Sequence, residues 1–258
     1  MPQGAVMRTY YFFTLLLLPS FAFSGVIPEK SRIIFNGKNT VQSSMLVNTN
    51  EYPVVVQLWV DNGEFNKSPE LTPSPFVITP VMSRMNPKKI NSAKIIYSGD
   101  GVVMPEDRES LFWLNIFEVP PVNKNLISEN EVALSMLTQI KLIYRPKKLE
   151  ISENDLIAKF DSLTFRLIKG SNGENQLVIS NPTEYISSLV NVELKGQENG
   201  KPVTFSSDEL KSITILPKST QKVPIDMVNP SALVDIDYWL IDDSGRLIDK
   251  RKILAAGK

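Results

Sequence analysis

Apolar residues recur at every second position along most of residues 131–146. A period of two places one set of side chains on a single face of a β-strand. Sixteen extended residues would reach about 50 Å, whereas a typical strand has about 5–6 residues. A long apolar strand with a free edge normally promotes aggregation, so we interpret this one as a strand that pairs with another chain. Its even positions are Val132, Leu134, Met136, Thr138, Ile140 and Leu142, all apolar except Thr138.

Shorter runs with strand character recur in both halves of the chain. Turn sequences such as Asn36-Gly37 separate several of them, and many short strands separated by turns are typical of an antiparallel sandwich. The three tryptophans lie in these runs, so we expect them in the core. The expected strands are 32–35, 43–47, 54–60, 94–97, 111–119, 132–144, 162–168, 176–180, 188–194, 212–216, 221–225 and 235–242.

The pattern predicts an all-β chain of two antiparallel sandwich domains, each of about the size of an immunoglobulin domain. Pro146 ends the first strand series, because proline has no N–H for a ladder hydrogen bond. We therefore expect an N-terminal domain over residues 25–147 and a C-terminal domain over residues 148–258. Each is close to the length of about 100 residues that an immunoglobulin-like sandwich needs.

Residues 1–24 have the pattern of a secretory signal peptide. Arg8 precedes a short apolar stretch, and Ala22-Phe23-Ser24 resembles a small-x-small cleavage site. The apolar stretch is too short to cross a bilayer. We expect export from the cytoplasm, no stable membrane insertion, and a mature chain that begins near Gly25.

Composition excludes several kinds of chemistry. The chain has no cysteine and no histidine, which excludes a disulfide framework, a Ser-His-Asp triad and any zinc site that uses histidine. Beyond the first 24 residues, 27 basic and 28 acidic residues remain, so overall charge gives no reason to expect nucleic-acid binding. We expect no enzymatic activity, metal or other cofactor.

Several motifs follow one another in order along the expected mature chain. They are SRIIFNG at 31–37, YPVVVQLWVD at 52–61, DRESLFWLN at 107–115, EVPP at 118–121, IKLIYRP at 140–146, VISNPT at 178–183 and DDSGR at 242–246. Together they resemble the periplasmic chaperones that escort fimbrial (pilus) subunits to an outer-membrane usher. The resemblance implies two immunoglobulin-like domains around a cleft, in a boomerang shape.

The resemblance also implies how such a chaperone uses the alternating stretch. Val132, Leu134 and Met136 would fill the groove of a fimbrial subunit that lacks its last strand, and the strand would be donated until the next subunit replaces it. Ile140 and Leu142 would belong to the core of the chaperone itself. Self-association of the free chaperone through the exposed strand is left open.

Charged residues in these motifs gain roles from the same resemblance. Arg32 and Lys141 would anchor the C-terminal carboxylate of the subunit in the cleft, which suits a planar guanidinium beside a compact ammonium. Lys141 has the opposite parity to the apolar row, so either a bulge or twist reorients it, or anchor and row use different faces. Glu109, Arg145 and Asp243 would form an ionic network between the domains, with Asp242 as the alternative to Asp243.

Two other functions are compatible with a β-sandwich chain. A structural or adhesive fimbrial subunit would need an N-terminal donor extension, whereas the donor-like stretch here is internal. A glycan-binding or glycan-hydrolysing protein would need exposed aromatic clusters or paired carboxylates, and the sequence shows neither.

Overall fold

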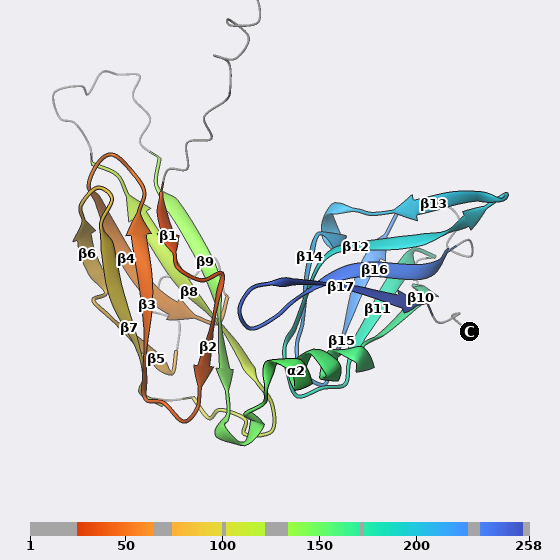
Figure 1. Ribbon diagram of the computed structural model, residues 1–258, viewed down its shortest axis with the longest axis horizontal. Helices are drawn as coiled ribbons and strands as arrows, with labels where there is room; N and C mark the ends of the chain where they lie inside the picture. The colour runs from red at the N-terminus through yellow and green to blue at the C-terminus, as the bar shows by residue number, and fades with distance from the viewer. Residues whose placement is uncertain are drawn as a thin grey trace, which may run out of the picture.

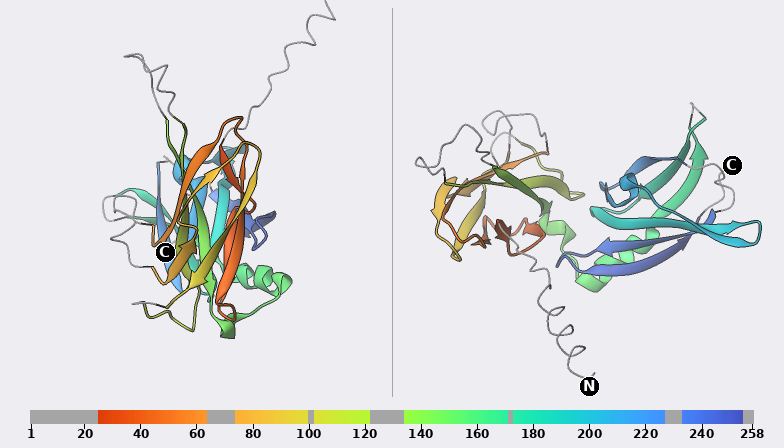
Figure 2. Two further views of the ribbon diagram at one scale, coloured as in Figure 1. Left: turned by 90° about the vertical axis from the view of Figure 1, so that its left-hand side faces the viewer. Right: turned by 90° about the horizontal axis from the view of Figure 1, so that it is seen from above.

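The computed structural model describes residues 25–63, 74–99, 102–121, 134–170, 173–226 and 233–254. Figure 1 shows two β-sandwiches that are set at an angle and joined through a short helical segment. The top view in Figure 2 shows the same two bodies side by side, with the helical segment between them. None of the helices in the described ranges has the length and apolar character that a membrane span requires.

The first sandwich packs two sheets against each other. All its strand pairs are antiparallel except β2 with β9, which run parallel. One sheet has the order β1-β3-β7-β5, made of Val26–Pro28, Val41–Asn48, Ile90–Tyr97 and Phe76–Thr79. The other has the order β2-β9-β8-β4-β6, made of Arg32–Asn36, Met136–Arg145, Ser110–Val119, Val54–Asp61 and Met82–Met85.

Alternating side chains build the core between these sheets. In β4, Val54, Val56 and Leu58 are buried, while Val55 between them is 39% exposed. The ring of Phe35 packs edge-on against Phe76 with 5.1 Å between ring centroids. The period of two along the sequence therefore becomes an inward and an outward face.

The second sandwich has the same construction and its own core. One sheet has the order β10-β11-β15, made of Thr164–Lys169, Asn175–Asn181 and Ser219–Ile225. The other has the order β13-β12-β16-β17, made of Lys201–Phe205, Ser187–Glu198, Leu233–Ile241 and Leu247–Ile253, with β14 (Ser212–Ile215) also paired to β12. The 3₁₀ turn η5 (Asp208–Leu210) precedes β14, and Leu189, Ile236 and Leu240 lie fully buried between the sheets.

Helical turns connect the two sandwiches. They are η3 (Lys147–Leu149), α2 (Glu153–Lys159) and η4 (Phe160–Ser162). Ser152 caps α2, since its hydroxyl accepts a hydrogen bond of 3.2 Å from the Asp155 N–H. Leu156 and Phe160 then bury their side chains in the second core.

The all-β expectation is confirmed, with differences in detail. The sequence pattern predicts neither α2 nor five of the strands: β1, β5, β6, β13 and β17. The predicted long strand also begins too early, because β9 starts at Met136 and Leu134 lies outside it. Val132 and the expected signal peptide lie outside the described residues. The expectation that the three tryptophans lie in the core is wrong, because Trp59 and Trp113 are only half-buried, Trp239 is 39% exposed, and none of them belongs to either core.

Candidate functional site

The first half of β9 has a strand neighbour on only one side. β8 pairs with β9 from Met136 to Tyr144, whereas β2 pairs with it only from Lys141 to Arg145. Among the described strands, none pairs with the β2-side edge of residues 136–140. Alternate backbone N–H and C=O groups along such an edge are available to another strand.

The register of β9 decides which way its side chains point. Its pairing with β8 is continuous from Met136 to Tyr144, without a bulge. Ile140 and Leu142 are buried in the first core, so Lys141 between them points to the opposite face. Of the two explanations left open by the sequence, the structure therefore supports different faces for Lys141 and the apolar row.

Exposure falls steadily along the alternating stretch. Leu134 is 78% exposed and Met136 is 49% exposed. Ile140 is 6% exposed and Leu142 is completely buried. The described part of the row thus divides into an exposed apolar end beside the free edge and a buried end that packs in its own domain.

Arg32 and Lys141 lie side by side on neighbouring strands. They are register partners in the parallel β2–β9 pair. Arg32 is only 5% exposed, and its Nη1 donates to the Ile241 carbonyl of β16 at 3.2 Å. Its Nε is buried with no hydrogen-bond partner. A buried guanidinium N–H without an acceptor is costly, so this group is suited to an incoming anion.

Lys141 reaches toward the second sandwich from the same place. Its Nζ donates to the Ser188 hydroxyl of β12 at 2.9 Å and lies 6.0 Å from the centre of the Trp113 ring. Burial and the adjacent Arg32 charge lower the pKa of Lys141 to about 8, and burial also lowers the pKa of Arg32. Two neighbouring, partly desolvated cations favour the binding of an anion between the sandwiches.

Trp113, which flanks Lys141, is itself held in place. A Cβ added to Gly63 would lie 2.8 Å from the Trp113 Nε1, and Gly63 has a φ of +89°, so both space and backbone require glycine there. Asn115 donates to Asp61 Oδ2 at 2.8 Å and accepts from Gln139 Nε2 at 2.5 Å. This chain of hydrogen bonds fixes β4, β8 and the free-edge half of β9 to one another.

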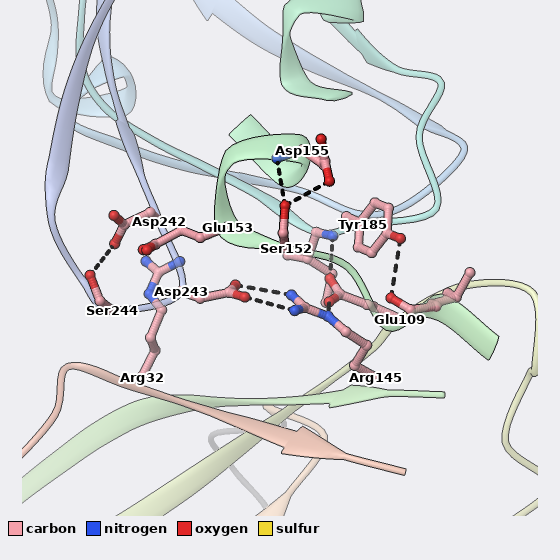
Figure 3. Close-up of polar contacts among 12 residues, drawn as sticks. Arg32, Glu109, Arg145, Ser152, Glu153, Asp155, Tyr185, Asp242, Asp243 and Ser244 are labelled. Atoms are coloured by element: carbon pink, nitrogen blue, oxygen red, sulfur yellow. Dashed lines mark hydrogen bonds and ion pairs between the residues drawn. The ribbon is translucent and has the colours of Figure 1, made fainter. Parts of the chain in front are cut away.

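A second charged group bridges the sandwiches (Figure 3). The Arg145 Nε donates to Glu109 Oε1 at 2.6 Å, and its Nη1 and Nη2 donate to Asp243 Oδ2 and Oδ1 at 2.7 and 2.9 Å. Arg145 lies at the end of β9, and Asp243 lies between β16 and β17. One guanidinium therefore joins a carboxylate of its own sandwich to one of the other.

Glu109 adds a direct backbone tie to this group. Its Oε2 accepts a hydrogen bond from the Ile186 N–H at 2.6 Å. Burial raises the pKa of Glu109 despite the adjacent Arg145, whereas the carboxylates around Arg145 outweigh its burial and raise the pKa of the guanidinium. The Arg145 guanidinium also lies 5.4 Å from the centre of the Tyr185 ring.

Asp242 has different partners from those of Asp243. Its carboxylate accepts from the Ser244 hydroxyl at 2.7 Å and from the Arg246 Nε at 2.8 Å. These bonds lower the pKa of Asp242 to about 2, against the effect of burial. Asp242 therefore holds the turn between β16 and β17 and presents Asp243 to Arg145.

The sequence does not reveal the hydrogen-bond partners of the candidate residues. Ser188, Ile186 and the Ile241 carbonyl all contact the charged groups across the gap between sandwiches, and nothing in their sequence context marks them. The buried Asn115 could have been suspected, because a polar residue at a strand position next to apolar neighbours needs a partner. In the described ranges, no group of three or more acidic, histidine or cysteine side chains is arranged to hold a metal ion.

The comparisons with known proteins follow the same division into two sandwiches. Residues 25–150 match the family described as "Pili and flagellar-assembly chaperone, PapD N-terminal domain", and residues 158–252 match "Pili assembly chaperone PapD, C-terminal domain". The chain belongs to the pilus-assembly chaperone family. The resemblance drawn from the ordered motifs, and the two immunoglobulin-like sandwiches, are thereby confirmed.

Individual family members align over most of this chain. It is 34% identical over 223 residues to the "Chaperone protein FimB/FhaD" of Bordetella pertussis, covering 83% of this chain and 82% of that protein. It is 29% identical to the "Probable fimbrial chaperone YadV" of Escherichia coli, covering 92% and 93%. Among solved structures, the CupB2 chaperone of Pseudomonas aeruginosa superimposes with a TM-score of 0.68 at 28% identity, covering 89% of this chain and 100% of that one.

Proposed function

We propose that this protein is a periplasmic chaperone that captures pilus subunits by lending them a β-strand. After removal of residues 1–24, domains over residues 25–147 and 148–258 flank the site. The free edge of β9 pairs with a subunit that lacks its last strand, and the complex then passes to an outer-membrane usher. The protein acts by binding alone, without enzymatic chemistry or a cofactor.

The free edge of β9 at residues 136–140 is the observation that carries this proposal. A strand of the subunit that pairs with this edge gains ladder hydrogen bonds, and the groove of the subunit accepts alternate side chains of the donated strand. Leu134 and Met136 are the exposed apolar residues next to it. Complete burial of each such side chain contributes about 1.5–3 kcal/mol before the cost of ordering the strand. Val132, outside the described residues, continues the same series.

The charged groups set where the subunit binds along β9. The C-terminal carboxylate of the subunit accepts hydrogen bonds from Arg32 and Lys141, including the unpaired Nε of Arg32. This contact fixes the register of the subunit strand that pairs with β9, because the C-terminal end of that strand is held at one point of the ladder. The network of Glu109, Arg145 and Asp243 keeps the two domains at the angle that brings Ser188 and Ile241 to the anchor.

Co-expression of a pilus subunit in the periplasm tests this function. The subunit alone should be degraded or aggregated, whereas with the chaperone it should be recovered as a soluble complex of one copy each. Recovery of the subunit at the same level without the chaperone would contradict the proposal. A structural subunit, the main alternative, would instead enter purified fibres, so mass spectrometry of isolated pili distinguishes the two functions.

Replacement of Leu134 by aspartate is expected to reduce subunit capture without unfolding the chaperone. Leu134 is 78% exposed and lies before β9, so a charge is tolerated in the free protein but not in an apolar groove. Ile253→Asp provides a matched control, since Ile253 is 81% exposed at the end of β17 in the other domain. Capture is measured by size-exclusion chromatography and folding by the melting temperature. Equal capture by both variants would show that Leu134 does not enter the groove.

Subunit binding is expected to weaken as pH rises above about 8. The pKa of Lys141 in the free protein is about 8, because burial and Arg32 disfavour the ammonium. A bound carboxylate favours the ammonium, so the bound pKa is higher and binding takes up a proton. Affinity should therefore be constant well below pH 8 and fall by up to about tenfold per pH unit above it. Titration calorimetry from pH 6.5 to 9.5 measures this, and Lys141→Met should abolish the slope.

A further inference from the structure

Glu118 is a buried carboxylate at the opposite end of β8 from the charged groups described above. It is 6% exposed. Its Oε2 accepts a hydrogen bond from the Val26 N–H at 2.7 Å, and its Oε1 accepts one from the Asn50 side-chain amide at 2.7 Å. Both donors are neutral. Within the described ranges, no lysine or arginine forms an ion pair with Glu118.

A buried carboxylate without a cation is unfavourable and calls for an explanation. Burial of an ion is costly unless another charge compensates it. Lys88 pairs with Glu51 at 2.8 Å rather than with Glu118. The Lys88 Nζ also donates to the Thr49 carbonyl at 2.6 Å. Met136, opposite Glu118 on β9, carries no charge.

Gly25 lies directly against this carboxylate. A Cβ on Gly25 would be 3.6 Å from Glu118 Oε2 and 3.5 Å from Met136 Sδ. The Gly25 carbonyl is held by the Thr49 N–H at 2.9 Å and the Thr49 hydroxyl at 2.8 Å. Because the backbone nitrogen and the added Cβ share one Cα, standard geometry places the Gly25 nitrogen within about 6 Å of the carboxylate.

We infer that Glu118 is the docking site for the new N-terminus that signal-peptide cleavage creates. Cleavage after Ser24 turns the Gly25 nitrogen into an α-ammonium, which becomes the missing cation. The inference rests on that cleavage position and not on strand donation. It assigns Glu118 to the maturation of the chain, with the free amino group of Gly25 as its ligand.

The pair formed by Glu118 and the Gly25 amino group lies beside the start of the free edge of β9, so signal-peptide cleavage would affect that edge. Glu118 and Met136 are register partners, and Met136 begins the edge that lacks a strand neighbour. Docking of the N-terminus therefore stabilises β1, β8 and the start of β9 together. A chain with a peptide bond at the Gly25 nitrogen lacks the charge and loses this stabilisation.

The inference is tested with two N-terminal forms, each with and without Glu118→Gln. One form begins at Gly25, released by a tag protease that cleaves before glycine. The other keeps Ser24 with its amino group acetylated, so that it brings no ammonium of its own. Intact mass spectrometry verifies each end. We expect the form that keeps Ser24 to melt lower by about 3–6 °C at pH 6. The difference should vanish in Glu118→Gln, where the amide oxygen still accepts the Val26 N–H.

The difference in melting temperature between the two N-terminal forms should decrease as pH rises. A carboxylate partner raises the α-amino pKa above its ordinary value of about 7.7–8.0. The added stability is therefore complete below the unfolded pKa and is lost as pH rises through the higher folded pKa. Besides Glu118, the side chains next to Gly25 are those of Thr49 and Met136, which do not titrate. The difference between the two forms therefore reports the pair of Glu118 and the Gly25 amino group.

A second measurement keeps the inference falsifiable if a variant fails to fold. NMR titration of protein labelled with ¹⁵N-glycine measures the α-amino pKa of Gly25 in the mature form directly. We expect a pKa about one unit above the ordinary value, and a return to it in Glu118→Gln. An ordinary pKa in the mature protein, or equal melting of both N-terminal forms, would overturn the inference.

Discussion

Replacement of Lys141 by methionine is expected to weaken subunit binding by about 10- to 100-fold. A charge-assisted hydrogen bond contributes about 1.5–3 kcal/mol, and about 1.4 kcal/mol corresponds to a factor of ten. In the free protein, burial and Arg32 disfavour the Lys141 ammonium. Methionine should therefore leave the melting temperature unchanged or raise it while binding falls. Calorimetry with a purified subunit and thermal unfolding measure the two effects separately.

Lys94→Met is the matched control for this substitution. Lys94 is an exposed lysine on β7, in the other sheet of the same sandwich. Lys94→Met should leave subunit binding unchanged. A similar loss of affinity in both variants would mean that the effect comes from overall charge. A peptide of the last residues of the subunit, with a free or an amidated C-terminus, then locates the contact. Amidation should weaken binding to the native chaperone, and it should weaken binding less in Lys141→Met, where Arg32 alone still contacts the carboxylate.

Arg32, Lys141 and the strand around them show which features the sequence predicts and which it does not. The apolar spacing predicts the buried pair Ile140 and Leu142, because side chains alternate along any strand. The neighbouring positions of Arg32 and Lys141 depend on the parallel pairing of β2 with β9. Their separation of more than a hundred residues leaves no local signal for that pairing. Only the resemblance to a family placed the two residues together.

Elements with a weak hydrophobic pattern are also not predicted from the sequence. β17 alternates exposed and half-buried residues without a buried face, so its hydrophobic pattern is weak. α2 has only seven residues, too few for a sustained helical period. Its start does carry a signal, since Ser152 followed by Asp155 three residues later is a capping pattern. The hydrogen bond of Lys141 to Ser188 crosses between domains and has no counterpart in local sequence.

Replacement of Arg145 by methionine is expected to lower the free energy of unfolding by about 3–5 kcal/mol, the usual cost when one partner of a buried ion pair is removed. The Glu109 side chain is 1% exposed and would lose its cation, although the Ile186 N–H still donates to it. Asp243 would lose both of its bonds to the guanidinium. Denaturant unfolding measures the loss. Small-angle scattering should show a broader range of distances between the two domains.

Two controls separate the buried network from ordinary surface pairing. Lys148→Met removes the Lys148–Glu106 pair, in which both side chains are 74% exposed, and should not shift the unfolding curve measurably. Arg145→Met combined with Glu109→Gln should recover part of the lost stability, because the double variant no longer buries an uncompensated charge. It should not restore the narrow distribution of domain distances, since the bridge to Asp243 stays broken. Full recovery of both properties would mean that Arg145 only neutralises Glu109 and does not hold the domains together.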